Sequence, residues 1–202
     1  MKTRTHLLLA AAALLLCSCI PSINPFYADL NVVWDARLLG EWQDASQTDD
    51  PDIWKFEPGD GKAYKLSVRE KGKQGVFEAH LFRLKDGYFL DLIPSECNFA
   101  TNQADLVAFS MFPGHLLVRV SELEPGLKLA LFDFDWLDKY LQKNPEALAH
   151  HSENKSIVLT ADTRELQRFV LEHLKEDELF AKPGELVRRT NSVSPALREP
   201  PR

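Results

Sequence analysis

"DIWKFEPGDGKAYKLSVRE", residues 52–70, decides the fold of this chain. In its first half Trp54 and Phe56 fall on the opposite face from two charged residues, a period of two that is typical of a β-strand with one buried face. "GDGK" follows as a turn signal, and Tyr64, Leu66 and Val68 then alternate in the same way. Two alternating runs joined by a glycine turn predict an antiparallel hairpin.

The same pattern continues along the first two-thirds of the chain. We expect further strands in "VFEAHLFRL" (76–84), "YFLDLIP" (88–94), "HLLVRVSEL" (115–123), "LKLALFDF" (127–134) and "SIVLT" (156–160). Short turns between such strands favour an antiparallel meander or barrel. The aromatic side chains on these strands could line a cavity or fill a core, and "LVAFSMFPG" (106–114) could be a buried strand or a lip over a cavity.

Two helices are expected after most of the strands. "DTRELQRFVLEHL" (162–174) has the spacing of a capping box at Asp162 and Glu165, and its apolar residues recur every three or four positions. A shorter helix around Trp136–Leu141 is expected to be capped by Asp135. The predicted fold class is therefore mainly β with helices: an antiparallel barrel or a strongly curved sheet, with a C-terminal helix packed outside.

The N-terminus has the layout of an export signal. Lys2 and Arg4 precede an apolar run at 7–16, which is shorter than the roughly 20 residues that span a bilayer. "LLLCSCIPS" (14–22) ends the run and resembles the bacterial lipobox. Ser18 is a small residue at a cut before Cys19, whereas a cut before Cys17 would place Leu16 there, so the resemblance assigns lipidation, with acyl chains such as palmitate, to Cys19. The alternative is a soluble periplasmic protein with an incidental cysteine.

These features predict the layout of the chain. We expect a signal peptide at 1–18, a lipidated tether at 19–30, one β-rich domain at 31–189 and a disordered tail at 190–202. Bacterial lipoproteins retained at the inner membrane carry aspartate after the cysteine, and Ile20 stands there instead. The lipobox resemblance thus implies a lipid-anchored cell-envelope protein at the outer membrane, facing the periplasm.

Charge and cysteine content exclude some classes of partner. The net charge is −6 and no basic block is present, which argues against nucleic acid. After the signal is removed, Cys97 is the one cysteine beside Cys19, so no disulfide is expected within the domain. Cys97 could be a small buried hydrophobe or a reactive thiol.

"LLGEWQD" (38–44) contains Gly40-x-Trp42, which resembles the first signature of the lipocalins. That resemblance implies a lipocalin-like barrel in which the motif lies on the first strand, the tryptophan closes the barrel floor and a long helix follows the last strand. "LTADTRELQRF" (159–169), with Arg164, is similar to the family's final motif, and the middle TDY-like motif is absent. The chain also resembles small uncharacterised bacterial lipoproteins with an "LxGxW" opening, which implies no particular activity.

Three residues are the candidates for chemistry. Glu78 and His80 are two apart and share one face of a strand, and Asp91 lies in the strand expected to pair with it. A Glu-His-Asp cluster could be an acid–base site or a set of metal ligands. In the alternative interpretation, Glu78 and His80 point to solvent and Asp91 lies at a strand end.

Other acidic and histidine residues are explained more simply. Asp133, Asp135 and Asp138 lack the spacing of a calcium loop and fit helix capping, while the adjacent His150 and His151 point apart. No metal site and no cofactor are expected.

Three functions remain open from the sequence. The first is a non-enzymatic binding or envelope-maintenance module that contacts the membrane through lipid on Cys19 and binds a small apolar ligand or an envelope protein. The second is a small hydrolase-like enzyme using Glu78, His80 and Asp91. The third is a purely structural subunit of an envelope complex.

Overall fold

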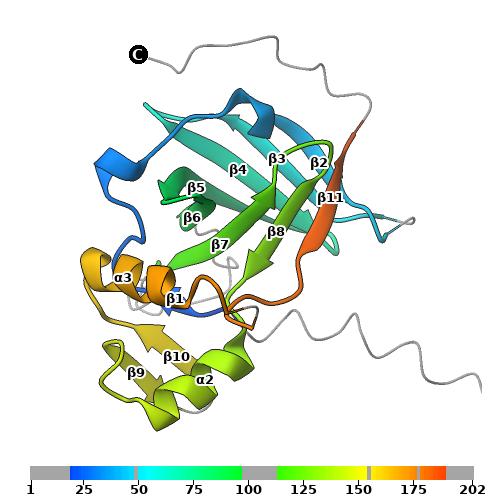
Figure 1. Ribbon diagram of the computed structural model, residues 1–202. Coiled ribbons are helices and arrows are strands. Elements are labelled where there is room, and N and C mark those ends of the chain that lie inside the picture. Colours follow the sequence, from blue (N-terminus) through cyan, green and yellow to red (C-terminus); the bar gives the residue numbers. More distant parts are fainter. Residues whose placement is uncertain (1–18, 48–49, 97–112, 154–155, 177, 190–202) are drawn as a thin grey trace, which may run out of the picture.

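The computed structural model describes residues 19–47, 50–96, 113–153, 156–176 and 178–189 (Figure 1). The expected signal peptide, Cys97, most of the stretch at 106–114 and the expected tail at 190–202 lie outside the described residues.

Eight of the described strands close into an antiparallel barrel. In spatial order they are β2 (Gly40–Asp44), β3 (Ile53–Pro58), β4 (Ala63–Glu70), β5 (Lys73–Leu84), β6 (Gly87–Glu96), β7 (His115–Glu122), β8 (Leu127–Leu131) and β11 (Gly184–Arg188). The pairing of β11 with β2 closes the ring. The prediction of a mainly β, antiparallel barrel is confirmed.

The hairpin that decides the fold forms as its pattern predicts. Phe56 lies opposite Leu66, and Trp54 lies opposite Val68, in the register of β3 and β4. These four side chains belong to or pack against the core inside the barrel. The turn between the strands contains Gly61 at φ 58°, a left-handed conformation that glycine adopts without steric cost.

The barrel interior is a hydrophobic core. An eight-stranded barrel encloses a space that side chains can fill. The buried side chains of this core are Leu38, Leu39, Trp42, Phe56, Tyr64, Leu66, Ala79, Leu81, Leu90, Leu92, Val118, Val120, Leu123, Leu127, Leu129 and Leu186. The interior aromatic residues therefore fill the core.

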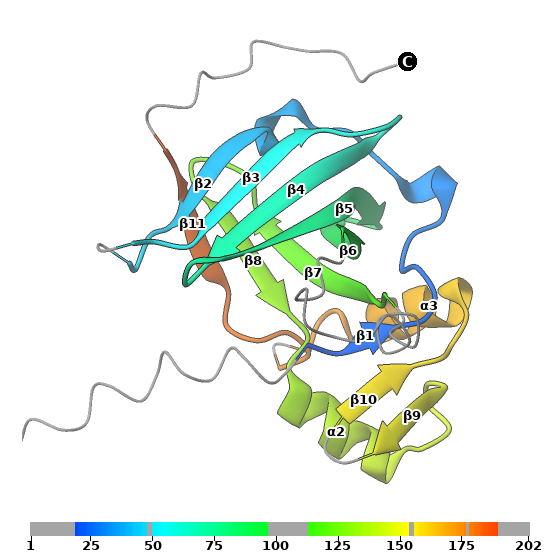
Figure 2. The same ribbon diagram turned by 180° about the vertical axis from the view of Figure 1, so that it is seen from behind.

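A second core lies on the outer wall of the barrel. There Phe82, Phe89 and Leu117 point outward from β5, β6 and β7 and join buried residues of two helices in one cluster. The helices are α2 (Phe134–Lys143) and α3 (Thr163–His173), and the small strands β1 (Pro21–Ser22), β9 (His150–Glu153) and β10 (Ser156–Leu159) complete this layer (Figure 2).

Both helices precede the last barrel strand instead of following it. Helix α3 begins as expected, since the Asp162 side chain accepts a hydrogen bond from the Glu165 N–H. The chain then returns to the barrel and adds β11, which the sequence analysis did not predict. Helix α2 is capped by Asp133, whose side chain accepts from the Trp136 N–H, so the expectation of a cap at Asp135 was wrong.

The segment expected to be a tether is part of the folded domain. Ile20, Ser22 and Phe26 are each buried, at 3 % exposure or less. Pro21–Ser22 forms β1, which pairs with β7 on one side and with β10 on the other. Apolar side chains and backbone pairing hold this segment, so it does not behave as a free linker.

Among the described residues, the helices are all too short or too polar to cross a membrane.

Candidate functional site

The three candidate residues meet on the outer wall of the barrel. His80 on β5 lies directly opposite Asp91 on β6, and Glu78 is two residues from His80 on the same face. A distance of 3.6 Å joins His80 Nε2 to Glu78 Oε1. The sequence analysis thus placed the three residues correctly beside one another, although their side chains point outward and not into the barrel.

Asp91 is the centre of this polar cluster. It is fully buried in the middle of β6, which rules out a position at a strand end. Its Oδ2 accepts a hydrogen bond of 2.7 Å from the Phe26 N–H, and its Oδ1 is 2.6 Å from His115 Nδ1. The carboxylate is therefore paired on both oxygens.

His115 is a member that sequence reasoning missed. It is the first residue of β7, on the strand next to β6, and its side chain is 12 % exposed. A buried carboxylate that orients a histidine through Nδ1 is the arrangement of an acid–base dyad. The same pairing also compensates a buried charge, which is a structural role.

His80 is covered by Tyr27. The two rings stack with centroids 4.3 Å apart, and no described residue accepts or donates a hydrogen bond at the buried His80 Nδ1. Burial lowers the pKa of His80, although the negative charges of Glu78 and Asp91 oppose that effect. Burial and the nearby carboxylates, Asp91 first, raise the pKa of Tyr27.

The cluster holds the N-terminal segment against the barrel. Asp91 binds the backbone of Phe26, and the next ring, Tyr27, lies on His80. From the other side, Thr163 Oγ1 donates to the Pro25 carbonyl and Gln167 Nε2 donates to the Phe26 carbonyl. Glu78, at 52 % exposure, is the part of the cluster that faces solvent.

A second polar arrangement surrounds Trp42 in the core of the barrel. This tryptophan on β2 is fully buried, and its Nε1–H donates to the Leu38 carbonyl at 2.8 Å. The guanidinium of Arg188 on β11 lies 4.2 Å from the centre of the Trp42 ring. Gly40, two residues earlier, has φ 116°, a conformation that side chains disfavour.

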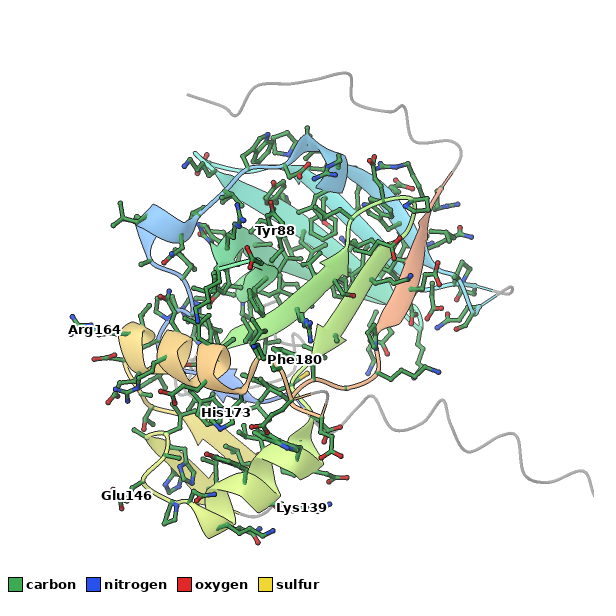
Figure 3. All side chains as sticks on the ribbon, in the orientation of Figure 1. Tyr88, Lys139, Glu146, Arg164, His173 and Phe180 are labelled. Atoms are coloured by element: carbon green, nitrogen blue, oxygen red, sulfur yellow. The ribbon has the colours of Figure 1, made fainter. Side chains whose placement is uncertain are left out.

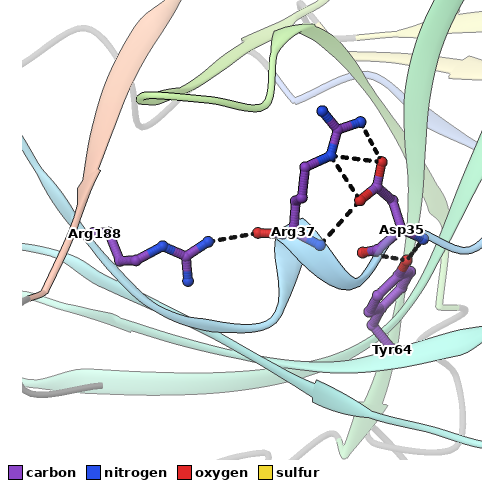
Figure 4. A network of polar contacts seen from close by, with 4 residues as sticks. All are labelled: Asp35, Arg37, Tyr64 and Arg188. Atoms are coloured by element: carbon purple, nitrogen blue, oxygen red, sulfur yellow. Dashed lines mark hydrogen bonds and ion pairs between the residues drawn. The ribbon is translucent and has the colours of Figure 1, made fainter. Parts of the chain in front are cut away.

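Arg188 also ties the last strand to the 3₁₀ turn before β2. It donates to the carbonyl of Arg37, within the turn Ala36–Leu38 (Figure 4), and to the carbonyl of Leu39, which follows that turn, at 2.7 Å each. The same turn is held by Tyr64, whose hydroxyl accepts from the Asp35 N–H. Burial alone would raise the pKa of the Asp35 carboxyl, but hydrogen bonds from Arg37 outweigh it and lower that pKa.

Arg164, in the stretch that resembles the final lipocalin motif, lies on α3. It is exposed on α3 and points away from the barrel (Figure 3). The arginine that contacts Trp42 is Arg188, the last residue of "GELVR" in the unpredicted strand β11.

The remaining candidates have local roles in the structure. Asp133 caps α2, and Asp138 accepts a hydrogen bond from Gln142 on the same helix. His150 contacts its own segment through the Leu148 carbonyl, and His151 lies 3.5 Å from Glu153. Within the part of the chain that the structure describes, no three histidine, cysteine or acidic residues are grouped to hold a metal ion.

Comparison with known proteins gives no match to a family model, to a curated protein or to a solved structure.

Proposed function

We propose that this chain is a lipid-anchored cell-envelope protein whose lipocalin-like barrel serves as a non-enzymatic binding or envelope-maintenance module. The observation that carries the proposal is the position of Cys19. Its side chain is exposed, while Ile20 beside it is 3 % exposed, so the cysteine that the lipobox selects lies directly beside a buried residue of the folded domain. Two or more acyl chains there would hold the protein stably in a leaflet.

The lipocalin-like class is supported by the end of the barrel that contains the G-x-W motif. Trp42 lies on the first barrel strand, as the resemblance implies, and Arg188 covers its ring from the last strand. Because large side chains occupy the barrel interior, an envelope-maintenance role in contact with other components is favoured over carriage of a ligand inside the barrel.

The polar cluster supports a non-enzymatic role. Asp91 is occupied by the Phe26 N–H and by His115, and Tyr27 covers His80, so the groups that could do chemistry fasten the N-terminal segment instead. With Ile20 in place of an aspartate, we place the protein at the outer membrane, facing the periplasm.

The direct test is metabolic labelling with radioactive palmitate followed by membrane fractionation. Wild type and Cys17→Ala are expected to incorporate label and to sediment with outer membranes, whereas Cys19→Ala incorporates none. Label in Cys19→Ala, or its loss in Cys17→Ala alone, contradicts the proposal.

A second candidate function is hydrolysis, favoured by the 2.6 Å pairing of Asp91 with His115. In that case Asp91 orients His115 as a general base for water, and Glu78 and His80 line the site. A panel of ester and amide substrates tests it with wild type and His115→Gln. Turnover by wild type that His115→Gln lacks would favour the enzyme.

A further inference from the structure

A surface cleft beside α2 lies apart from the polar cluster. Its volume is about 500 Å³, within the range of small-ligand sites. One wall is α2, and the other is the segment that leads from α3 to β11. Figure 3 labels Lys139 on the first wall and Phe180 on the second.

Charged side chains of both signs line this cleft. Lys139 and Lys143 are four residues apart and so share one face of α2, and Lys182 comes from the opposite wall. Asp135 and Glu178 are the acidic residues there, beside Asp133, which is engaged as the cap of α2.

These charged side chains are not paired with one another within the described structure. Neither the three lysines nor Asp135 and Glu178 form an ion pair or a hydrogen bond with another described side chain. Asp135 and Lys139 are one helical turn apart, a spacing at which such residues commonly pair, yet they stay separate. A ligand that carries both a negative and a positive group would form ion pairs with the lysines and with the acidic residues.

The cleft also has an aromatic surface. Trp136 and Tyr140, both half-buried, stack at 4.9 Å on the face of α2 that lines the cleft, and Phe180 is buried at its edge. Tryptophan is the aromatic ring that attracts an ammonium group most strongly. Asp135 and Trp136 both line the cleft, so together they suit an amine.

We propose that this cleft binds a zwitterionic group with a phosphate and an amine, of the phosphoethanolamine class. The phosphate is held by Lys139, Lys143 and Lys182, and the amine by Asp135, Glu178 and the ring of Trp136. Binding at this site does not depend on lipidation of Cys19, so it can be tested separately from the proposed function.

Calorimetric titration of the purified protein with glycerophosphoethanolamine tests the site. The double variant Lys139→Ala/Lys143→Ala is expected to weaken binding about tenfold or more, since each lost charge-assisted contact contributes strongly. Lys73→Ala/Lys175→Ala removes the same charge from exposed positions outside the cleft and should change the affinity less than about twofold. No saturable binding by wild type, or equal losses in the two double variants, would overturn the proposal.

A second pair of variants tests the zwitterion itself. Asp135→Asn/Glu178→Gln is expected to weaken glycerophosphoethanolamine severalfold while leaving or improving the affinity for inorganic phosphate. If both ligands weaken equally, the acids do not bind the amine and the proposed chemistry is wrong.

Vesicles distinguish a lipid headgroup from a free ligand. Phosphatidylethanolamine vesicles that compete with glycerophosphoethanolamine, where phosphatidylcholine vesicles do not, assign the headgroup of a bilayer as the source. Absence of competition from either vesicle, with binding of the free compound intact, assigns a soluble phosphate–amine ligand.

Discussion

Asp91 accepts a hydrogen bond from the backbone N–H of Phe26, 65 residues earlier in the chain, at 2.7 Å. The carboxylate is fully buried, and its other oxygen is bound by His115. A buried charge of this kind is stable only while its partners remain in place. The contact therefore makes the N-terminal segment and the barrel wall depend on each other.

Asp91→Ala is expected to lower the free energy of unfolding by about 3–5 kcal/mol, because it leaves His115 and the Phe26 N–H without their buried acceptor. Urea unfolding measures the loss. Limited proteolysis should also show faster cleavage within residues 20–30.

Glu78→Ala is the matched control, since Glu78 is half-exposed and its ion pair with His80 spans 3.6 Å. A change below about 1 kcal/mol is expected there. Equal losses in the two variants would mean that the Phe26 contact does not hold the segment.

Trp42→Ala is expected to cost about 3–5 kcal/mol, because it opens a cavity in the barrel core and removes the surface on which Arg188 lies. Arg188→Lys keeps the charge but not the planar fork that reaches two carbonyls, so a smaller loss is expected. Thermal and urea melts compare the variants. A Trp42→Ala midpoint equal to wild type would remove the evidence that this ring supports the barrel end.

Gly40→Ala tests the backbone at the G-x-W motif. At φ 116° a side chain is strained, and a loss of about 1–3 kcal/mol is expected. Gly184→Ala is the control, since a Cβ there would meet its nearest atom, the Leu129 carbonyl oxygen, only at 4.0 Å. Similar stabilities of the two variants would contradict a special role for Gly40.

The alternation of apolar and polar residues along the sequence predicted the strands from β3 to β8, because one face of each strand packs inside the barrel. "AYKLSVRE" matches β4 at both ends, Ala63 and Glu70. Strand β11 was not predicted because "GELVR" is short and buries one leucine. Strand β1 was not predicted because it has two residues and begins with proline. Such short strands form because neighbouring strands pair with them, and their own sequences show little alternation of apolar and polar residues.

The candidate site was only half predictable for a related reason. Glu78, His80 and Asp91 belong to strands joined by a tight turn, so their register followed from the turn. His115 starts β7, and a long connection separates that strand from β6, which leaves the register open. Arg188 reaches Leu39 across 149 residues, a contact that only closure of the barrel brings about.

Phe169→Ala tests how far the second core supports the domain. Phe169 is 2 % exposed on α3 and contacts the rings of Trp136, Tyr140 and His173. A loss of about 3–5 kcal/mol is expected. Arg168→Ala, its exposed neighbour, should stay within about 0.5 kcal/mol of wild type. A melting temperature unchanged by Phe169→Ala would show that α3 is loosely attached.

His80 should make stability depend on pH. Burial beneath Tyr27 lowers its folded-state pKa, so the folded protein binds its proton less readily than the unfolded chain does. As the pH falls through about 6.5, the unfolded chain gains a proton that the folded protein does not, and stability decreases until the folded-state pKa is passed. Glu78, Asp91 and Asp29 act to raise the pKa of His80, and His115 adds to the lowering.

Urea unfolding of wild type and His80→Gln, at roughly pH 7.5, 6.5 and 5.5, isolates that contribution. The variant cannot titrate at this position, so its stability should fall less on acidification than that of wild type. His151→Gln is the control, because His151 is 70 % exposed and should follow wild type at each pH. If wild type and His80→Gln lose stability in parallel, or if wild type loses less, His80 does not resist protonation in the fold. Tyr27 would then leave the imidazole open to water, and the Phe26 N–H bond to Asp91 would be the contact that joins the N-terminal segment to this cluster.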